Sequence, residues 1–254
     1  MQSEIYEQGS PRWHAERLGR ITASPCGCLL VNGKTKDNRI LPVGFGAGAE
    51  TYAVKLLDEL LTGLPSDIIT SWDMEYGNTY EPMARKQFIE TYFPDDDCYQ
   101  ASFVNHPELQ LVGCSPDLLI GSEGGAEFKS RSKESHSRLL LEQDYWAQLG
   151  EEPEVPKENM PQVQFCMWVT ERQWWYYGSF NPQHPRITRL VTIRVERDEM
   201  MIKKLAERAA IMQDAVIAAY QRITGSTEFE VDIDRLSRFL SSSPSEKLRF
   251  FLEE

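Results

Sequence analysis

The chain has 254 residues, of which 41% are hydrophobic and 26% charged, so it is long enough for one large domain or one domain with an appendage. No apolar run approaches the roughly 20 residues of a membrane-spanning helix, and the first residues show no secretory signal. We therefore expect a cytoplasmic protein without a membrane partner. The net charge of −12 excludes binding of a polyanion by overall attraction, so contact with nucleic acid requires local basic patches.

The cysteines and histidines do not predict a zinc site. A structural zinc site takes four ligands in two close pairs, and of the five cysteines only Cys26 and Cys28 are near neighbours. The four histidines are scattered along the chain. We expect reduced, mostly buried thiols.

Charge is segregated along the sequence. Residues 11–40 and 128–140 are basic, whereas 141–160 and the C-terminal end are acidic. The two basic stretches are therefore the candidate contacts with a polyanion. They contain Arg12, Arg17, Arg20, Lys34, Lys36 and Arg39 in the first stretch, and Lys129, Arg131, Lys133 and Arg138 in the second.

In the N-terminal part, Ser24 followed by Pro25 predicts the start of a helix. Serine caps the free amides of a first turn, and proline suits the first helical position. A helix N-terminus attracts anions, and Arg17 is close in sequence. The segment is therefore either a phosphate pocket or an ordinary capped surface helix, and the spacing leaves both interpretations open.

The turn-forming residues 32–44 predict a basic loop, and two helices are expected after it. Apolar residues recur at helical spacing over 45–61 and again over 71–92. Glu81 lies beside the apolar stripe of the second helix, where it could turn toward a sheet. A glutamate in this position is more often a solvated surface residue.

From residue 98 onward, strand and helix patterns alternate, which favours an α/β or α+β layered fold. One expected helix is mostly apolar but contains Gln162 and Gln164. A buried amide without a partner is costly, so at least one of these glutamines should form an internal hydrogen bond. We expect strands over 98–105, 109–120, 125–131, 174–180 and 187–196, and helices over 132–150, 160–170 and 198–223.

The last residues, 224–254, change character: they are acidic and rich in serine, with clusters of phenylalanine and leucine. We interpret them as a C-terminal extension with one short helix, appended to a domain of residues 1–223. The aromatic cluster should pack on the domain or on a neighbouring subunit.

The strongest chemical motif is Cys114-Ser115-Pro116-Asp117, followed after the glycine-rich turn 121–125 by Glu127-Phe128-Lys129. Asp117 closes the apolar run 109–120, and the pattern predicts a β-hairpin. Residues i and i+2 of a strand share a face, so the returning strand should present Glu127 and Lys129 together. Alone, the pattern also fits an exposed hairpin whose carboxylates pair with a lysine.

This residue set suits phosphodiester hydrolysis. Mg²⁺ takes oxygen ligands and keeps several waters, so Asp117, Glu127 and the carbonyl of Phe128 suffice as protein ligands. One or two such ions activate a water and compensate the charge on the phosphate. Lys129 would orient or deprotonate the attacking water.

The sequence resembles the phage lambda exonuclease family, the YqaJ-type viral recombinases of the PD-(D/E)XK nuclease superfamily, over residues 10–222. The resemblance implies an α/β fold with a restriction-endonuclease-like core, a central mixed β-sheet flanked by helices. The matching motifs occur in the family's order: Trp13-His14 through Arg17-Leu18-Gly19 to Ile21-Thr22-Ala23-Ser24; Tyr76-Gly77 with Tyr80-Glu81; Cys114 to Asp117; Glu127 to Lys129; and Gln162-Val163-Gln164 through Met167-Trp168-Val169-Thr170.

The resemblance also implies an activity: 5′→3′ digestion of one strand of linear duplex DNA to mononucleotides, with Mg²⁺ as cofactor and Mn²⁺ as a substitute. The 3′ overhang would pass to a single-strand annealing recombinase. A homotrimeric ring around the DNA would keep an acidic protein on its substrate. The encoding genome would be that of a phage or prophage in a bacterial host.

The family's site residues match positions of this chain. The catalytic set is Asp117, Glu127 and Lys129 with Glu81 and Gln162, and the metal ligands are Asp117, Glu127 and Phe128. Arg17, Ser24 and Ser115 match the pocket for the 5′-phosphate, Met74 matches an apolar wedge at the terminal base pair, and Trp13 lies near the same duplex end. Further DNA contacts are expected from Arg131 and from the 32–44 loop, where Lys34, Lys36 and Arg39 remain alternatives.

Two other functions fit parts of this pattern. One is a sequence-specific or flap endonuclease on the same core. The other is a non-catalytic subunit that binds DNA ends, which the complete set of acidic ligands and the lysine disfavours.

Overall fold

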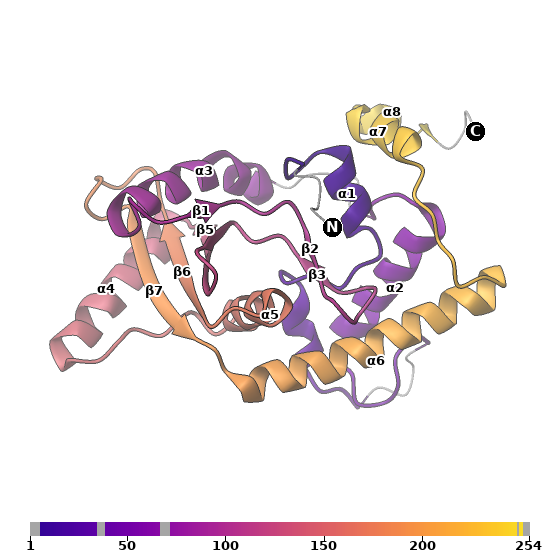
Figure 1. Ribbon diagram of the computed structural model, residues 1–254, viewed down its shortest axis with the longest axis horizontal. Helices are drawn as coiled ribbons and strands as arrows, with labels where there is room; N and C mark the ends of the chain where they lie inside the picture. The colour runs from indigo at the N-terminus through magenta and orange to yellow at the C-terminus, as the bar shows by residue number, and fades with distance from the viewer. Residues whose placement is uncertain (1–5, 35–38, 67–71, 248, 251–254) are drawn as a thin grey trace. The chain divides into compact units, whose positions relative to one another are not determined.

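The computed structural model describes residues 6–34, 39–66, 72–247 and 249–250, and the chain folds into two compact units (Figure 1). Each unit is built from segments that are far apart in the sequence. Unit 1 contains the described residues of 1–69, 102–115 and 200–254, and unit 2 those of 70–101 and 116–199. The predicted limit between residues 1–223 and a C-terminal extension stays a prediction.

Unit 2 is built on a five-stranded mixed sheet with the order β1-β4-β5-β6-β7. Strands β5 and β6 pair in parallel, and every other neighbouring pair is antiparallel. A parallel pair needs a long crossover, which here contains two helices. The elements are α3 (Trp72–Tyr92), β1 (Cys98–Tyr99), β4 (Leu118–Ile120), β5 (Gly124–Ser130), α4 (Lys133–Leu149), α5 (Met160–Thr170), β6 (Trp174–Phe180) and β7 (Leu190–Glu196).

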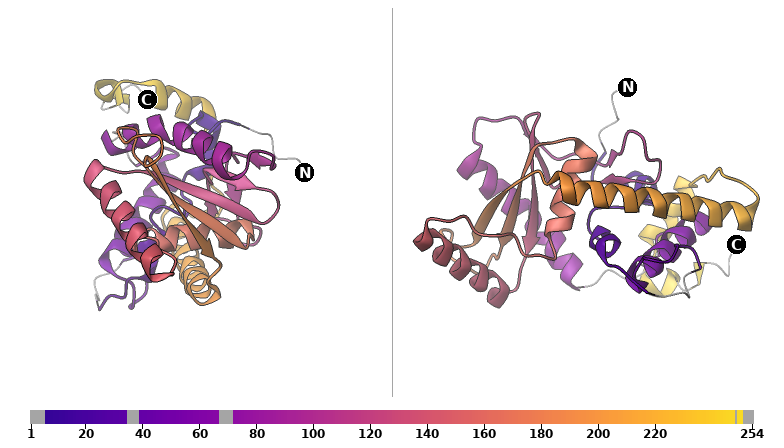
Figure 2. Two further views of the ribbon diagram at one scale, coloured as in Figure 1. Left: turned by 90° about the vertical axis from the view of Figure 1, so that its left-hand side faces the viewer. Right: turned by 90° about the horizontal axis from the view of Figure 1, so that it is seen from below.

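The central strand β5 has two differently covered faces (Figure 2). Phe128 points to the face covered by α3, where it belongs to an apolar cluster with Ala84 and Phe88 of that helix. Because side chains alternate along a strand, Glu127 and Lys129 point to the opposite face. That face also carries Ser179 of β6, which contacts α4. The sheet therefore separates a dry apolar layer from the layer that carries the charged motif.

Unit 1 contains two short strands and most of the N- and C-terminal helices. Its longest helix, α6, buries a stripe at helical spacing that includes Ile202, Leu205 and Met212. The elements are α1 (Pro11–Arg17), the 3₁₀-helix η1 (Cys26–Leu30), α2 (Ala47–Thr62), β2 (Val104–Asn105), β3 (Gly113–Cys114), α6 (Glu199–Thr224), α7 (Ile233–Ser241) and α8 (Pro244–Lys247).

The structure corrects the predicted strand over residues 109–120. Strand β3 pairs with β2, whereas β4 pairs with β1 and β5 in a different sheet. Pro116 lies between them and has no backbone N–H, so a continuous ladder is interrupted there. Ser115 and Asp117 therefore do not share one strand, and Asp117 lies in a bend directly before β4.

The predicted helix at Ser24-Pro25 is also wrong in kind. The segment forms only the five-residue η1, whose N-cap is Pro25 and which has no side-chain cap. The capped α-helix lies one motif earlier, where the Ser10 hydroxyl accepts a hydrogen bond from the Trp13 amide and Pro11 occupies the first turn. The predicted helices between residues 45 and 224 agree with the structure within about two residues, which is the usual uncertainty of helix ends, whereas the C-terminal residues form two helices where one was predicted.

Among the described residues, no helix is long and apolar enough to cross a membrane. All five cysteines carry free thiols, as expected, and Cys26, Cys114 and Cys166 are buried.

Candidate active site

The hairpin of β4 and β5 places Asp117 against the backbone of β5. The Asp117 side chain is buried, and its Oδ2 accepts a hydrogen bond of 2.6 Å from the Phe128 amide. In a strand, the N–H and C=O of one residue point to the same side. The Phe128 carbonyl therefore also points toward the Asp117 side of β5, where a third oxygen ligand is expected.

Glu127 is the centre of the charged motif. Lys129 Nζ lies 2.7 Å from Glu127 Oε1, which confirms that these two side chains share one face. The Gln162 amide of α5 donates a hydrogen bond to the same carboxylate oxygen. Glu127 is buried, so both contacts form away from bulk water. The structure thus brings together three of the predicted catalytic residues around one carboxylate.

Both glutamines of α5 have internal partners, where the sequence predicted a partner for at least one. Gln164 donates to the Glu196 carbonyl at 2.9 Å and accepts from the Asp198 amide at 2.8 Å. Gln164 therefore ties α5 to the end of β7, while Gln162 is turned to the motif.

Glu81 of α3 joins the same group of charges through an arginine. Arg85, one turn further along α3, binds Glu81 Oε1 at 2.9 Å and donates to the Asp117 carbonyl at 3.1 Å. Arg85 thus connects the helix glutamate to the bend that carries Asp117. Sequence reasoning missed Arg85, although its position four residues after Glu81 is the spacing of a helical ion pair.

The electrostatics show three carboxylates competing for too little positive charge. Burial, and then the charges of Glu127 and Glu81, raise the pKa of Asp117 well above its ordinary value. Burial and then Glu127 also raise the pKa of Glu81, against the opposing effect of Arg85. Burial lowers the pKa of Lys129, but Glu127 and Asp117 outweigh it, so the net shift is upward. The cluster is therefore short of positive charge, which a bound cation would supply.

The donor set fits a hard divalent cation. Carboxylates and a backbone carbonyl are the oxygen ligands that Mg²⁺ takes, and the cluster's excess negative charge favours a cation. Among the residues that the structure describes, no three His, Cys, Asp or Glu side chains are already gathered as a metal cage. Glu81 is turned toward Arg85, so two carboxylates, Asp117 and Glu127, are the ligands the geometry supports.

A second group of predicted residues comes together in unit 1. Trp13 Nε1 donates to the Ser115 hydroxyl at 2.9 Å, and Arg17 Nη1 donates to the same oxygen at 3.2 Å. The Arg17 guanidinium also stacks over the Trp13 ring, 4.3 Å from its centroid. Trp13 and Arg17 are one helical turn apart on α1, so the helix presents both to Ser115. Ser24 is exposed in the turn before η1.

The remaining predicted DNA contacts are less organised. Lys34 and Arg39 are exposed on either side of residues 35–38, and Lys36 falls outside the described residues. Met74 lies on the first turns of α3, but its side chain also falls outside what the structure describes.

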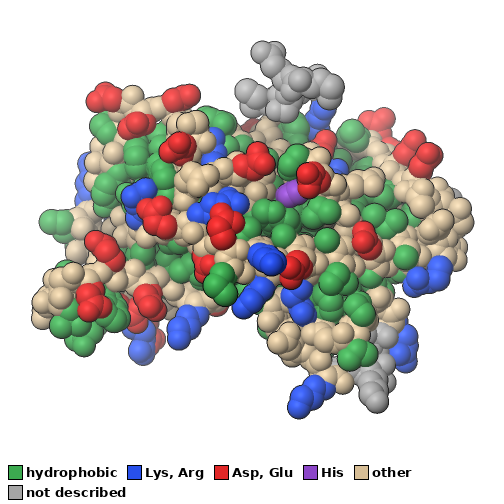
Figure 3. Space-filling view, turned by 60° about the horizontal axis from the view of Figure 1, so that its bottom comes forward, with side chains coloured by type: hydrophobic (Ala, Val, Ile, Leu, Met, Phe, Trp, Pro, Cys, Tyr) green, Lys and Arg blue, Asp and Glu red, His purple; other side chains and the backbone are tan. Residues whose placement is uncertain are grey.

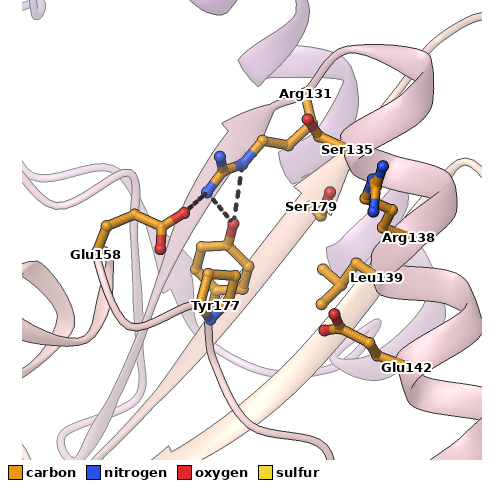
Figure 4. Close-up of a pocket in the computed structure, with 9 residues that line it drawn as sticks. Arg131, Ser135, Arg138, Leu139, Glu142, Glu158, Tyr177 and Ser179 are labelled. Atoms are coloured by element: carbon orange, nitrogen blue, oxygen red, sulfur yellow. Dashed lines mark hydrogen bonds and ion pairs between the residues drawn. The ribbon is translucent and has the colours of Figure 1, made fainter.

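Arg131 follows β5 and lies on the wall of a cavity of about 320 Å³ between β6, α4 and the loop before α5 (Figure 4). Its Nη2 donates to the Tyr177 hydroxyl at 2.9 Å and to Asn159, and lies 3.6 Å from the exposed Glu158 carboxylate. Tyr177 pairs in register with Glu127 on the neighbouring strand. Arg131 therefore extends the row of cations that begins with Lys129, although its guanidinium already has partners.

Arg172 is the second important residue that the sequence did not reveal. Its buried Nη1 donates to the carbonyls of Ile120, Gly121 and Gly124, at 3.1, 2.9 and 2.6 Å. It thereby fixes the turn between the two strands that frame the motif. A lone arginine after a helix carries no sequence signal for this role.

The fold is shared with several solved structures. An alkaline exonuclease, LHK-Exo, from Laribacter hongkongensis matches with a TM-score of 0.68 and 24% identity, covering 85% of this chain and 97% of that chain. The complex of LHK-Exo with dAMP matches with a TM-score of 0.69 over the same shares and at the same identity. A phage-related exonuclease from Haemophilus somnus 129PT matches with a TM-score of 0.56 and 16% identity, covering 81% of this chain and 96% of that one.

These likenesses define an α/β protein with the restriction-endonuclease-like mixed sheet that the sequence predicts, flanked by helices. The family is shown by a sequence match: residues 12–173 match the YqaJ-like viral recombinase domain. The chain belongs to this family, which confirms the resemblance. No curated protein matches the chain.

Proposed function

We propose that the protein is a Mg²⁺-dependent 5′→3′ exonuclease that digests one strand of linear duplex DNA to mononucleotides. The observation that carries the proposal is the Glu127 carboxylate, buried on β5 with the Lys129 ammonium 2.7 Å away, next to a second buried carboxylate, Asp117, which is hydrogen-bonded to the Phe128 amide. Its membership in the YqaJ-like family and its fold, shared with solved exonucleases, support the same activity.

Each residue of the cluster has a distinct task in this proposal. Asp117, Glu127 and the Phe128 carbonyl would hold the metal, which supplies a Lewis acid and an activated water when bound. Lys129 orients that water and offsets charge on the scissile phosphate. Gln162 holds the Glu127 carboxylate in place, and Glu81 forms an ion pair with Arg85. Mn²⁺ is expected to substitute, because it accepts the same oxygen ligands.

The 5′-terminal phosphate would be bound by Arg17 and Ser115. A guanidinium and a hydroxyl are suitable donors for phosphate oxygens, and the Trp13 ring holds the Arg17 plane in position. Ser24 is proposed as a third residue of this pocket, and Met74, Lys34, Arg39 and Arg131 are proposed as further DNA contacts.

The decisive assay compares an end-labelled linear duplex with a covalently closed circle in Mg²⁺. We expect digestion of the linear DNA with early release of the 5′ label as a mononucleotide, and an intact circle. Asp117→Asn should abolish digestion, whereas Asp95→Asn, in an exposed turn, should not. Cutting of the circle would instead indicate an endonuclease. Binding of ends without any digestion would indicate a non-catalytic subunit.

The phosphate pocket has its own test. The protein should digest 5′-phosphorylated ends faster than 5′-hydroxyl ends, and Arg17→Ala should remove that preference. Arg12→Ala, an exposed arginine on the same helix, is the matched control and should keep it. An unchanged preference in Arg17→Ala would refute the assignment of the pocket.

We further propose that three copies form a ring around the DNA and that the 3′ overhang passes to a single-strand annealing recombinase. The charge of the protein supports enclosure: its net charge is −12, and Figure 3 shows acidic and basic side chains interspersed on the face it presents. Attraction alone would not retain the DNA. A stable monomer in sedimentation experiments would contradict the ring.

A further inference from the structure

The described residues that follow α6, with helices α7 and α8, are anchored in unit 1. The Asp232 side chain caps α7 by accepting a hydrogen bond from the Arg235 amide at 2.9 Å. The Arg235 side chain in turn donates to the Thr62 carbonyl at the end of α2, at 2.6 Å. Further along, the Phe250 ring packs edge-to-face on Phe239 at 5.3 Å. The segment is thus held to its own unit by polar and apolar contacts.

Helix α7 packs on α1, as Figure 1 shows. Leu236 and Phe239 of α7 are almost completely buried, and they form one cluster with Leu18 and Leu64. Ala15 of α1 packs at the edge of this cluster. The apolar side of α7 is therefore directed at the end of α1.

Helix α1 depends on such a support. Of its seven residues none is buried, and a helix of two turns is far too short to be stable by itself. Ala15 and the C-cap residue Leu18 contact the α7 cluster, while Trp13 and Arg17 contact Ser115. One side of α1 is thus anchored by the C-terminal segment, and the other carries the proposed phosphate pocket.

The segment also brings a positive charge to α1. Burial, and then the charges of Arg17 and Lys247, lower the pKa of His14 to about 4. Lys247 stands at the end of α8 with its ammonium 5.3 Å from the centroid of the Phe239 ring. Phe239 packs with Leu18, the residue that follows Arg17, so the Lys247 ammonium lies near the end of α1 that carries the pocket.

We propose that helices α7 and α8 position α1, with Lys247 adding one positive charge near its end, and thereby set the affinity of the Trp13–Arg17–Ser115 pocket for the 5′-terminal phosphate of DNA. The inference rests on the proposed function, because it assigns the segment to the same pocket. The role of the segment is positioning, because Leu236 and Phe239 act by packing against α1. Lys247 acts by electrostatic attraction of the bound phosphate.

Two variants of the full chain separate packing from charge. Leu236→Ala removes a buried contact with α1, and Lys247→Gln removes the charge and its contact with the Phe239 ring while leaving the packing of Leu236 and Phe239 against α1. Arg238→Gln, an exposed cation on α7, is the charge-matched control. The readout is KM and kcat on duplexes with 5′-phosphate or 5′-hydroxyl ends, at low and high salt.

We expect both variants to raise KM for phosphorylated ends by about three- to tenfold, with kcat and the KM for hydroxyl ends unchanged. The Lys247→Gln effect should shrink at high salt, and the His14 pKa, followed by NMR, should rise in Lys247→Gln but not in Arg238→Gln. Such a result supports the inference, and Lys247→Gln provides it even if Leu236→Ala folds poorly.

A wild-type preference for phosphorylated ends that neither Lys247→Gln nor a folded Leu236→Ala reduces would overturn the inference and leave the proposed function standing. Equal digestion of both kinds of end by the wild type would instead overturn the phosphate pocket itself, and with it this role of the segment.

Discussion

Replacing Arg172 should show how strongly one buried cation holds the catalytic hairpin. Arg172→Met keeps most of the apolar stem but removes the guanidinium that contacts the Ile120, Gly121 and Gly124 carbonyls. The two protons on Nη1 serve these three acceptors, and each hydrogen bond to a charged group is worth about 1.5–3 kcal/mol. Two such bonds give about 3–6 kcal/mol, and relief of the buried charge opposes part of it. We therefore expect Arg172→Met to lower the free energy of unfolding by about 2–4 kcal/mol.

The assay is urea unfolding of the full chain, followed by fluorescence of the tryptophans. Arg186→Met is the matched control, because Arg186 is exposed and pairs with Glu90 at 3.3 Å on the surface. A surface pair of this kind contributes less than about 1 kcal/mol. If the free energies of unfolding of the Arg172 and Arg186 variants differ by less than about 1 kcal/mol, Arg172 does not stabilise the hairpin as argued.

Three further predictions concern the same unit. A Cβ on Gly125 would lie 2.3 Å from the fully buried Trp175 ring, so Gly125→Ala should lower the free energy of unfolding in urea by about 3 kcal/mol. Gly77→Ala, in open space on α3, should raise the free energy of unfolding by about 0.5–1 kcal/mol. An unchanged stability of Gly125→Ala would show that the sheet shifts freely. Glu171 directly follows α5 and has a φ angle of 57°, a conformation that glycine adopts without strain. Glu171→Gly should therefore stabilise the protein by about 1 kcal/mol, and Glu171→Ala should not. Equal effects of the two substitutions would exclude the backbone conformation as the cause. Because the pKa of Asp117 is raised on folding, the metal-free protein should lose stability as the pH rises from the ordinary carboxyl pKa through the raised one. Asp117→Asn should flatten this dependence of stability on pH when unfolding is measured in EDTA. Parallel pH dependences of the variant and the wild type would contradict the raised pKa.

Much of the fold follows from patterns that are local in the sequence. Apolar spacing predicted the long helices, and the turn at 121–125 with alternating neighbours predicted the hairpin that brings Asp117 beside the strand of Glu127 and Lys129. The strand over 109–120 was wrong because apolar content does not tell which sheet a residue joins. Pro116 marks the break, but a proline at a strand end leaves the same signal.

Two of the four serine–proline pairs in the chain show another limit of sequence reasoning. Ser10-Pro11 and Ser24-Pro25 carry the same helix-start signal, yet only the first begins an α-helix. The difference lies in tertiary packing: α1 is covered by a helix more than 200 residues away in the sequence. The contacts of Arg172 with the hairpin, and that of Arg85 with the Asp117 carbonyl, likewise join residues distant in sequence, so spacing alone could show only the Arg85–Glu81 ion pair.

The interleaved chain path has a consequence for biosynthesis. Unit 2 ends at residue 199, whereas unit 1 needs residues 200–254 to join segments made at the start of translation. On a ribosome that adds roughly 5–20 residues per second, unit 2 has all its residues several seconds before unit 1 does. Until residues 200–254 are made, the apolar residues Leu18 and Leu64 of the N-terminal segment lack the partners Leu236 and Phe239 that complete their cluster. Premature termination near the end of the message would leave a folded catalytic sheet joined to an unfinished unit, a species prone to aggregation.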